Sequence, residues 1–456
     1  MRIRWYFLFF LVSGFCSLVY EVVWLRLSVA MFGVTTPMVS IVLSVFMAGL
    51  GLGSWGGGSL VRRLKVSGAA TALRLYGLTE VLIGISGLVV PLLLGWGHEI
   101  LGNLGKHLVW DSYAYYLASG LWIAISLLPW CTCMGATIPF AMAAMRMTVG
   151  NQAQRSFSYL YLANVVGAIL GTLVPAFLLI EMFGFRSTLR IASLLNGVLA
   201  GSVFLSSFYV QSDAIHATQR TSTSRLYNWP ESSLLWLLFT TGLCSMAMEV
   251  VWIRLFTVYL GNVVYAFAAI LSLYLGATFL GSRAYRWWAG SHDLDRTAFL
   301  WSVLGLTALF PLLFGGPSLR LPMLGHEIGF ALGAVRALFG IVPFSAILGF
   351  LTPMLVDHWS GGDPDRGGRA YAVNVVGAIL GPLLAGFWVL PWLGERWGLC
   401  LMSLPLFFIG FSMNWRGETA MAKSQSALPS RVVFACGCAA LSTFSRYDKG
   451  FRRERP

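Results

Sequence analysis

The feature that most restricts the fold of this 456-residue chain is a segment that occurs twice. SGFCSLVYEVVWLRL at 13–27 returns 228 positions later as TGLCSMAMEVVWIRL at 241–255. The same spacing separates the GHEI segments at 97–100 and 325–328. A register that holds over such a distance indicates two copies of one structural unit, because self-similarity at a fixed offset is the sequence signature of a duplicated fold.

Both copies consist mainly of apolar runs. Hydrophobic residues make up 57% of the chain and charged residues only 11%, well below the charged share of soluble domains. A lipid core about 30 Å thick needs about 20 apolar residues of helix, so each such run predicts a membrane span. We expect twelve spans, near residues 5–29, 35–59, 72–96, 114–145, 157–183, 187–210, 232–258, 263–285, 297–316, 328–356, 370–393 and 397–413.

The repeat also predicts the relative orientation of the two copies. YLANVVGAILG at 161–171 pairs with YAVNVVGAILG at 371–381, and GATIP at 135–139 pairs with GFLTP at 349–353. Each copy holds six spans, so both copies enter the membrane from the same side. The prediction is an all-α integral membrane protein with about twelve transmembrane helices in two parallel six-helix repeats. Its parts are a first bundle, a linker, a second bundle and a basic tail, at 1–210, 211–231, 232–413 and 414–456.

The distribution of basic residues predicts the topology. Most of the 31 Lys and Arg residues fall in alternate loops on the side of the N-terminus, and cytoplasmic loops are those that retain such residues. We therefore expect a multi-pass protein in the lipid of the cell (inner) membrane, with the linker and both termini in the cytoplasm. The net charge of +13 follows from this topology, so no nucleic-acid partner is expected. Residues 432–444 are too short and too rich in small residues to predict a further span.

Two acidic residues occupy the same place in the two copies. Glu21 and Glu249 lie inside their spans, where a carboxylate is costly and usually faces a cavity or a partner. Two interpretations are open: the pair couples to protons or captures a cation, or each acid ties its helix to a neighbour. Arg26 and Arg254 follow five residues later, about 140° around the helix, and are expected to anchor the outer interface instead of pairing with these acids.

A third acid makes the halves chemically unequal. Glu80 lies in the third span and has no acidic counterpart in the ninth. It has either a functional role or a structural one, in which it pairs with Arg26 or with a hydroxyl. Aromatic residues near the acids either line a site for an organic cation or serve as packing and interfacial belt. They are Tyr20, Trp24, Trp252, Tyr161 and Tyr371.

Small and kink-forming residues recur at matched positions. An Asn precedes a Gly-x-x-x-Gly run in spans 5 and 11, which predicts close helix contact stabilised by an interhelical amide bond. A Pro in spans 4 and 10 predicts a kink. The candidate packing or gating positions are Asn164, Asn374, Pro139, Pro353, Gly53 and Gly281.

Catalytic and metal-binding patterns are not expected to explain this chain. No Ser-His-Asp, P-loop or haem-attachment pattern occurs in the sequence. The Cys131-x-Cys133 and Cys436-x-Cys438 pairs have no second ligand pair at zinc-like spacing. We therefore predict a non-catalytic protein without a metal or a cofactor.

Five ordered motifs carry a family resemblance. SGFCSLVYEVVWLRL, FMAGLGLGSWGGG, LRLYGLTEVLIG, MGATIPF and YLANVVGAILGTLVPAFLL resemble the membrane part of the fused major facilitator/spermidine synthase proteins, over about residues 10–410. The resemblance implies an MFS-like bundle in which spans 3, 6, 9 and 12 face lipid and the others line a central cavity. Gly57, Gly58, Arg62 and Arg63 fit the facilitator signature after span 2, but Val61 stands where that signature has an Asp.

The resemblance also bears on activity. In that family an aminopropyltransferase-like domain usually follows the membrane part, whereas about forty residues follow Trp415 here, too few for a Rossmann-like domain. Spermidine synthesis is therefore not expected of this chain. The first hypothesis is a transporter that moves a polyamine or a related small organic cation by alternating access. The alternative is a membrane scaffold or receptor that recruits a separate soluble synthase-like or methyltransferase-like enzyme.

Overall fold

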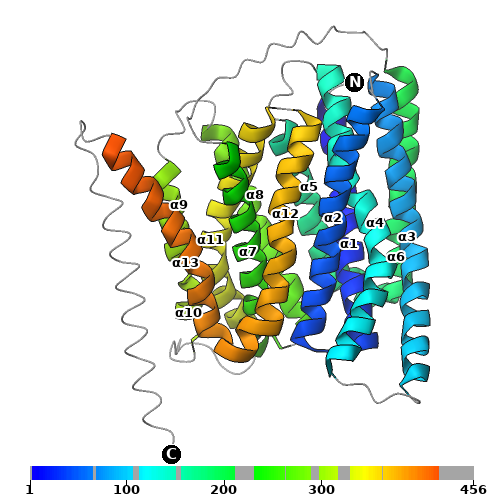
Figure 1. The fold of residues 1–456 in the computed structure, drawn as a ribbon. Helices are drawn as coiled ribbons and strands as arrows, with labels where there is room; N and C mark the ends of the chain where they lie inside the picture. Colours follow the sequence, from blue (N-terminus) through cyan, green and yellow to red (C-terminus); the bar gives the residue numbers. More distant parts are fainter. Residues whose placement is uncertain are drawn as a thin grey trace, which may run out of the picture.

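The structure is a computed structural model, which describes residues 3–64, 68–105, 112–149, 156–210, 231–261, 263–288, 297–316, 329–361 and 363–420. The expected linker, apart from Glu231, lies outside these residues, as do the second GHEI segment and the tail from residue 421, including 432–444. Every element in the described part is a helix (Figure 1).

The first half contains the helices α1 to α6. They are α1 (Ile3–Phe32), α2 (Thr36–Arg63), α3 (Ala69–Leu104), α4 (Ser112–Val149), α5 (Ser156–Val174) and α6 (Ile180–Tyr209), with a π-helical segment, η2 (Pro175–Leu179), between the last two. The run from α5 to α6 is broken at Gly184, whose φ of 73° interrupts the helix. Positive φ favours glycine, so this position ends the fifth span and begins the sixth.

The second half repeats this plan. Its helices are α7 (Glu231–Leu260), α8 (Val263–Trp288), α9 (Thr297–Thr307), α10 (Phe310–Phe314), α11 (Gly329–Ser360), α12 (Pro364–Leu384) and α13 (Leu390–Ala420), with η5 (Ala385–Val389) between the last two. Gly394, with φ 71°, breaks the run from α12 to α13, as Gly184 does in the first half. The π-helical segments also match in register, because η5 begins 210 residues after η2.

These elements confirm the predicted twelve-span architecture. Nine helical runs in the described part are long and apolar enough to cross a membrane. Two of them, Tyr159–Tyr209 and Asp365–Met413, are each divided into two spans by the glycine breaks, and the shorter run Phe299–Phe314 accounts for the ninth span. That ninth span is interrupted at residues 308–309, just before Pro311, which lacks the N–H that a continuous helix needs.

Two helix pairs join the halves. Figure 1 shows the helices of the two halves standing side by side, and the main contacts between halves run from α2 to α12 and from α5 to α8. The Ser44 hydroxyl donates to the carbonyl of Ile379 (2.9 Å), and that of Ser54 donates to the carbonyl of Gly368 (3.4 Å). We name the two packed helix pairs, α2 with α12 and α5 with α8, the seam.

Glycines allow backbone-to-backbone contact inside each half. Gly167 and Gly171 of α5 lie against α1 so closely that a Cβ would collide with carbonyl oxygens of that helix. In the second half Gly377 and Gly381 lie against α7 in the same way. Without a hydrophobic effect between helices in lipid, such close packing is a main source of helix association.

The other predicted packing positions lie at similar contacts. The Asn374 amide donates to the Leu238 carbonyl (2.7 Å) and to the Thr241 hydroxyl (3.2 Å) of α7, and Asn164 lies beside Gly14 of α1. Gly53 packs on the backbone of α4, and Gly281 packs on that of α11. Pro139 and Pro353 lie within the continuous helices α4 and α11.

Large apolar side chains cover the outside of the bundle. On α3 the exposed ones include Leu88, Leu92 and Trp96, and on α6 they include Leu194 and Phe208. An exposed apolar surface of this extent fits contact with lipid. Trp388, Trp392, Leu404 and Phe408 continue it over η5 and α13.

Close packing at Gly377 leads to the first prediction. We expect Gly377→Ala to lower the midpoint of thermal unfolding of the detergent-solubilised protein, by the equivalent of about 1 to 3 kcal/mol, because the new methyl meets the Phe239 carbonyl. Gly276→Ala in α8 is the matched control, since nothing lies within 4 Å of its Cβ position. That variant should keep or raise the midpoint, because Ala is the better helix former. Equal midpoints for the two variants would refute the packing argument.

Candidate functional site

The repeated acids are buried at equivalent positions of the two halves, within electrostatic reach of one another. Glu21 of α1 and Glu249 of α7 are 7% and 2% exposed, and the two carboxyl groups interact electrostatically. The nearby arginines are engaged elsewhere. Arg26 lies over the rings of Phe185 and Tyr265, and Arg254 forms an ion pair with Glu395 (2.7 Å). Neither of these arginines is therefore engaged with the two carboxyls.

Three tyrosines join these acids into one polar cluster, which we name the central cluster. Tyr371 of α12 interacts with Glu21 and with Tyr161 of α5. Tyr274 of α8 interacts with Glu249 and with both of the other tyrosines. Helices of both halves thus contribute to the cluster, and α5, α8 and α12 are helices of the seam.

Short hydroxyl side chains hold two of these tyrosines. Tyr161 forms a side-chain hydrogen bond with Thr278, and Tyr274 forms one with Ser245. Tyr274 was not among the predicted site residues. Its counterpart 228 positions earlier is Phe46, so a search for repeated polar residues could not find it.

The other predicted aromatic residues lie at different places. Tyr20 stacks on Trp24, with ring centroids 5.2 Å apart, and its hydroxyl donates to Asn196 (3.3 Å) inside the first half. Trp252 packs edge-on against Phe344 and tilts toward Tyr274 of the central cluster. The indole N–H groups of Trp24 and Trp252 are buried and have no hydrogen-bond partner among the described residues.

Glu80 is not part of the central cluster. It is fully buried between α1, α3 and α6, where the Asn196 amide donates to its Oε2 (2.5 Å). Arg26 was one of the two structural partners predicted for Glu80, the other being a hydroxyl. Arg26 does not pair with Glu80, because its guanidinium lies over Phe185 and Tyr265.

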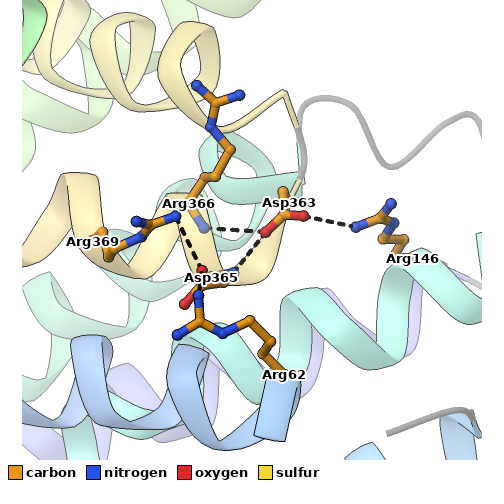
Figure 2. A network of polar contacts seen from close by, with 6 residues as sticks. All are labelled: Arg62, Arg146, Asp363, Asp365, Arg366 and Arg369. Carbon is orange, nitrogen blue, oxygen red and sulfur yellow. Dashed lines mark hydrogen bonds and ion pairs between the residues drawn. The ribbon is translucent and has the colours of Figure 1, made fainter. Parts of the chain in front are cut away.

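A network of ion pairs joins the halves at the end of the bundle that carries the start of α12. Figure 2 shows Arg62 at the end of α2 paired with Asp365 (3.0 Å), and Arg146 at the end of α4 paired with Asp363 (3.3 Å). Arg369 also reaches Asp365 (3.1 Å), one helical turn away. The second half thus supplies Arg62 with a carboxylate although Val61 replaces the Asp of the facilitator signature.

The geometry of α12 explains why these acids lie there. Asp363 caps the helix, because its Oδ1 accepts hydrogen bonds from the backbone N–H groups of Asp365 (2.9 Å) and Arg366 (3.1 Å). Pro364 follows the cap, at a position where a helix tolerates the missing N–H. This capped start extends α12 six residues beyond the predicted beginning of its span.

Different side chains close the seam at the opposite end. The Tyr265 hydroxyl of α8 donates to the Glu181 carboxylate, and its ring stacks on Phe177 of η2. The matching residue of η5, Phe387, packs edge-on against Tyr116 of α4. Side-chain contacts thus join the halves at both ends of the seam, by ion pairs at one end and mainly by aromatic contacts at the other.

Among the described residues, no group of three or more His, Cys, Asp or Glu side chains could hold a metal ion. The chemistry that the central cluster offers is instead that of two buried carboxyls with aromatic faces beside them. Such an arrangement favours positive charge.

Comparisons with known proteins support the fold. The chain is similar to the solved structure of a mutant form of the nucleoside transporter NupG, with a TM-score of 0.53 at 12% identity, over 90% of this chain and 98% of that one. It is also similar to FucP, a major facilitator superfamily transporter in the outward conformation, with a TM-score of 0.50 at 14% identity, over 93% and 99%. The fold is that of the major facilitator transporters. The chain is thus a multi-pass membrane protein with this all-helical fold.

A comparison by sequence finds a relative that matches only part of this chain. Polyamine aminopropyltransferase 2 of Streptomyces coelicolor (strain ATCC BAA-471 / A3(2) / M145) is 25% identical over 197 residues, which is 43% of this chain and 33% of that protein. The matched segment is thus about a third of that relative's length. No protein-family model matches the chain.

The ion-pair network leads to the second prediction. In a double-mutant cycle of Arg62→Gln and Asp365→Asn, we expect a coupling of about 0.2 to 1 kcal/mol, because the Arg62 side chain is 60% exposed and solvent weakens the pair. Thermal unfolding in detergent measures it, and raised salt should reduce it. Arg63→Gln is the control partner, since Arg63 is exposed at the next position of α2. Coupling of the same size in both cycles would contradict the assigned pair.

Proposed function

We propose that this protein is a secondary transporter that moves a small organic cation, of the polyamine class, by alternating access. The observation that carries the proposal is that Glu21 and Glu249 of opposite halves are both buried within electrostatic reach of one another, while Arg26 and Arg254 are engaged elsewhere. Two like charges repel strongly in a medium of low dielectric constant. A cargo with two separated amines relieves this repulsion, because one ammonium group can neutralise each carboxylate.

The tyrosines support the same class of cargo. Tyr161, Tyr274 and Tyr371 are half-buried around the acids and offer both ring faces and hydroxyl oxygens. An alkylammonium chain is held by ring faces through cation–π contact, and its N–H groups donate to hydroxyl oxygens. The name of the curated relative, a polyamine aminopropyltransferase, points to the same chemistry.

The position of the cluster supports alternating access. Each half supplies one acid, and close glycine contacts make each half a compact unit. If the halves rock about the central cluster, the cargo meets first one side of the membrane and then the other. The ion-pair end and the aromatic end of the seam would then open in turn. The scaffold hypothesis stays a prediction, because it depends on a soluble partner.

The third prediction tests the cargo site. In proteoliposomes that contain the purified protein, we expect uptake of radiolabelled spermidine, and we expect Glu21→Gln and Glu249→Gln each to reduce it at least about tenfold. Loss of one carboxylate leaves one ammonium group of the cargo unpaired in a desolvated site, and an unpaired buried charge costs several kcal/mol.

Glu99→Gln is the matched control, because Glu99 is an exposed acid near the end of α3. Uptake by this variant should equal that of the wild type. Undiminished uptake in both Glu21→Gln and Glu249→Gln would end the proposed role of the pair. A different outcome is a wild type that takes up another cation and no spermidine. If that uptake depends on both acids, the proposed cargo is wrong and the proposed site is supported.

A further inference from the structure

We propose that Glu80 is a proton-binding site inside the first half, separate from the central cluster, and that its Oε1 takes up and releases the proton. The assignment of this carboxyl as a proton site rests on the geometry of the first half alone. Its role as the coupling site of transport rests in addition on the proposed function.

A chain of hydrogen bonds orients the carboxyl. The Tyr20 hydroxyl of α1 donates to Oδ1 of Asn196 (3.3 Å), so the amide nitrogen of this α6 residue points the other way, to Glu80. That nitrogen donates to Oε2 (2.5 Å). Two glycines of α3 make room for the chain, since Gly84 lies against the Asn196 side chain and Gly87 lies against the Tyr20 ring.

The second oxygen of Glu80 has no fixed partner. Oε1 is buried without a hydrogen bond of good geometry, although the hydroxyls of Ser13 and Tyr76 lie beside the carboxyl. The Tyr76 hydroxyl donates to the Phe9 carbonyl (3.4 Å). A hydroxyl can donate to a carboxylate and can also accept from a carboxylic acid, so this surrounding serves Glu80 in both protonation states.

The charged and titratable groups around Glu80 favour a proton over other cations. Those that interact with it are Cys16 and Tyr20 of α1 and Tyr76 of α3, and α6 supplies the neutral Asn196. None of them is basic, and among the described residues Glu80 takes part in no ion pair. An isolated ionised carboxylate in such surroundings is costly, and taking up a proton removes that cost. A metal ion needs several oxygen ligands, whereas the amide N–H already occupies Oε2.

The second half has apolar residues at the positions that match these polar groups. The residues 228 positions after Tyr20, Tyr76 and Glu80 are Met248, Leu304 and Ala308, and all three are fully buried. Met248 and Leu304 thus pack in their helices as apolar side chains, and Ala308 is buried at the interruption of the ninth span. Apolar packing is generally as stable as a buried polar cluster, or more so, which indicates that the first half keeps its cluster for another purpose.

The cluster also lies next to the cargo site. Tyr20 immediately precedes Glu21 on α1, and its ring stacks on Trp24 one turn further along. When Oε1 gains or loses a proton, the hydrogen bonds of Asn196 and Tyr20 rearrange, and α1 carries that change to the Glu21 carboxyl. Proton binding in one half is thereby linked to the cation site between the halves.

The fourth prediction tests the proton site without any cargo. We expect infrared difference spectra of the purified Glu21→Gln/Glu249→Gln protein, recorded against pH, to contain a C=O band of a buried carboxylic acid. Adding Glu80→Gln should remove that band, and adding Glu99→Gln should leave it unchanged. Tyr20→Phe should shift the band, because the amide that contacts Glu80 loses its own partner. If Glu80→Gln does not fold, Glu80→Ala replaces it, since Ala308 fills the equivalent position. Identical spectra with and without Glu80 would overturn the proposal.

A transport measurement on the otherwise wild-type chain separates this inference from the proposed function. With a pH gradient, Glu80→Gln should accumulate spermidine at least about tenfold less than the wild type, while exchange between equal spermidine pools should continue, because exchange requires no net proton movement. Normal accumulation in Glu80→Gln would refute the coupling role. A wild type that carries no spermidine would refute the proposed cargo, and the infrared result would still decide whether Glu80 binds a proton.

Discussion

The close approach of helix backbones at glycines is the contact on which the rest of this structure depends. In lipid the backbone polar groups must be satisfied within each helix, and no hydrophobic effect drives helices together, so side-chain size decides where they can touch. Gly167 and Gly171 bring α5 onto α1, and Gly377 and Gly381 bring α12 onto α7. Because α1 and α7 also carry the repeated acids, these contacts fix Glu21 relative to α5, which carries Tyr161, and Glu249 relative to α12, which carries Tyr371.

The seam between the halves is held differently from their interiors. Each end depends on a pair with an exposed partner, namely Arg62 with the largely buried Asp365 at one end and Glu181 with Tyr265 at the other. Solvent-weakened pairs contribute about 1 kcal/mol or less, so breaking them would cost little if the halves move as the proposed function requires. The difference between rigid interiors and weak ends is what a bundle needs if it is to rock about a buried central cluster.

Much of this architecture could be predicted from the sequence, because lipid imposes a minimum length on each apolar run and the repeat imposes a common plan. The helix breaks at Gly184 and Gly394 fall between predicted spans for that reason. The site was harder to predict. Tyr274 has a Phe as its repeat counterpart, and Asn196 lies in a span that shows little similarity between the halves. Asp363 and Asp365 lie outside the predicted windows, so only their three-dimensional position reveals that they meet Arg62 and Arg146.

Comparison of the two copies distinguishes the repeated acids, Glu21 and Glu249, from Glu80, which occurs only in the first copy. A site formed where two related halves meet uses the same position of each, so Glu21 and Glu249 have to persist together if both carboxyls are to face one cargo. A group that works within a single half needs no counterpart, and the second half buries Ala308 at the position that matches Glu80. Duplication therefore supplies the symmetric pair, and divergence after duplication supplies the single buried acid. Under the proposed function, one molecule would then bind a cation at its centre and a proton on one side.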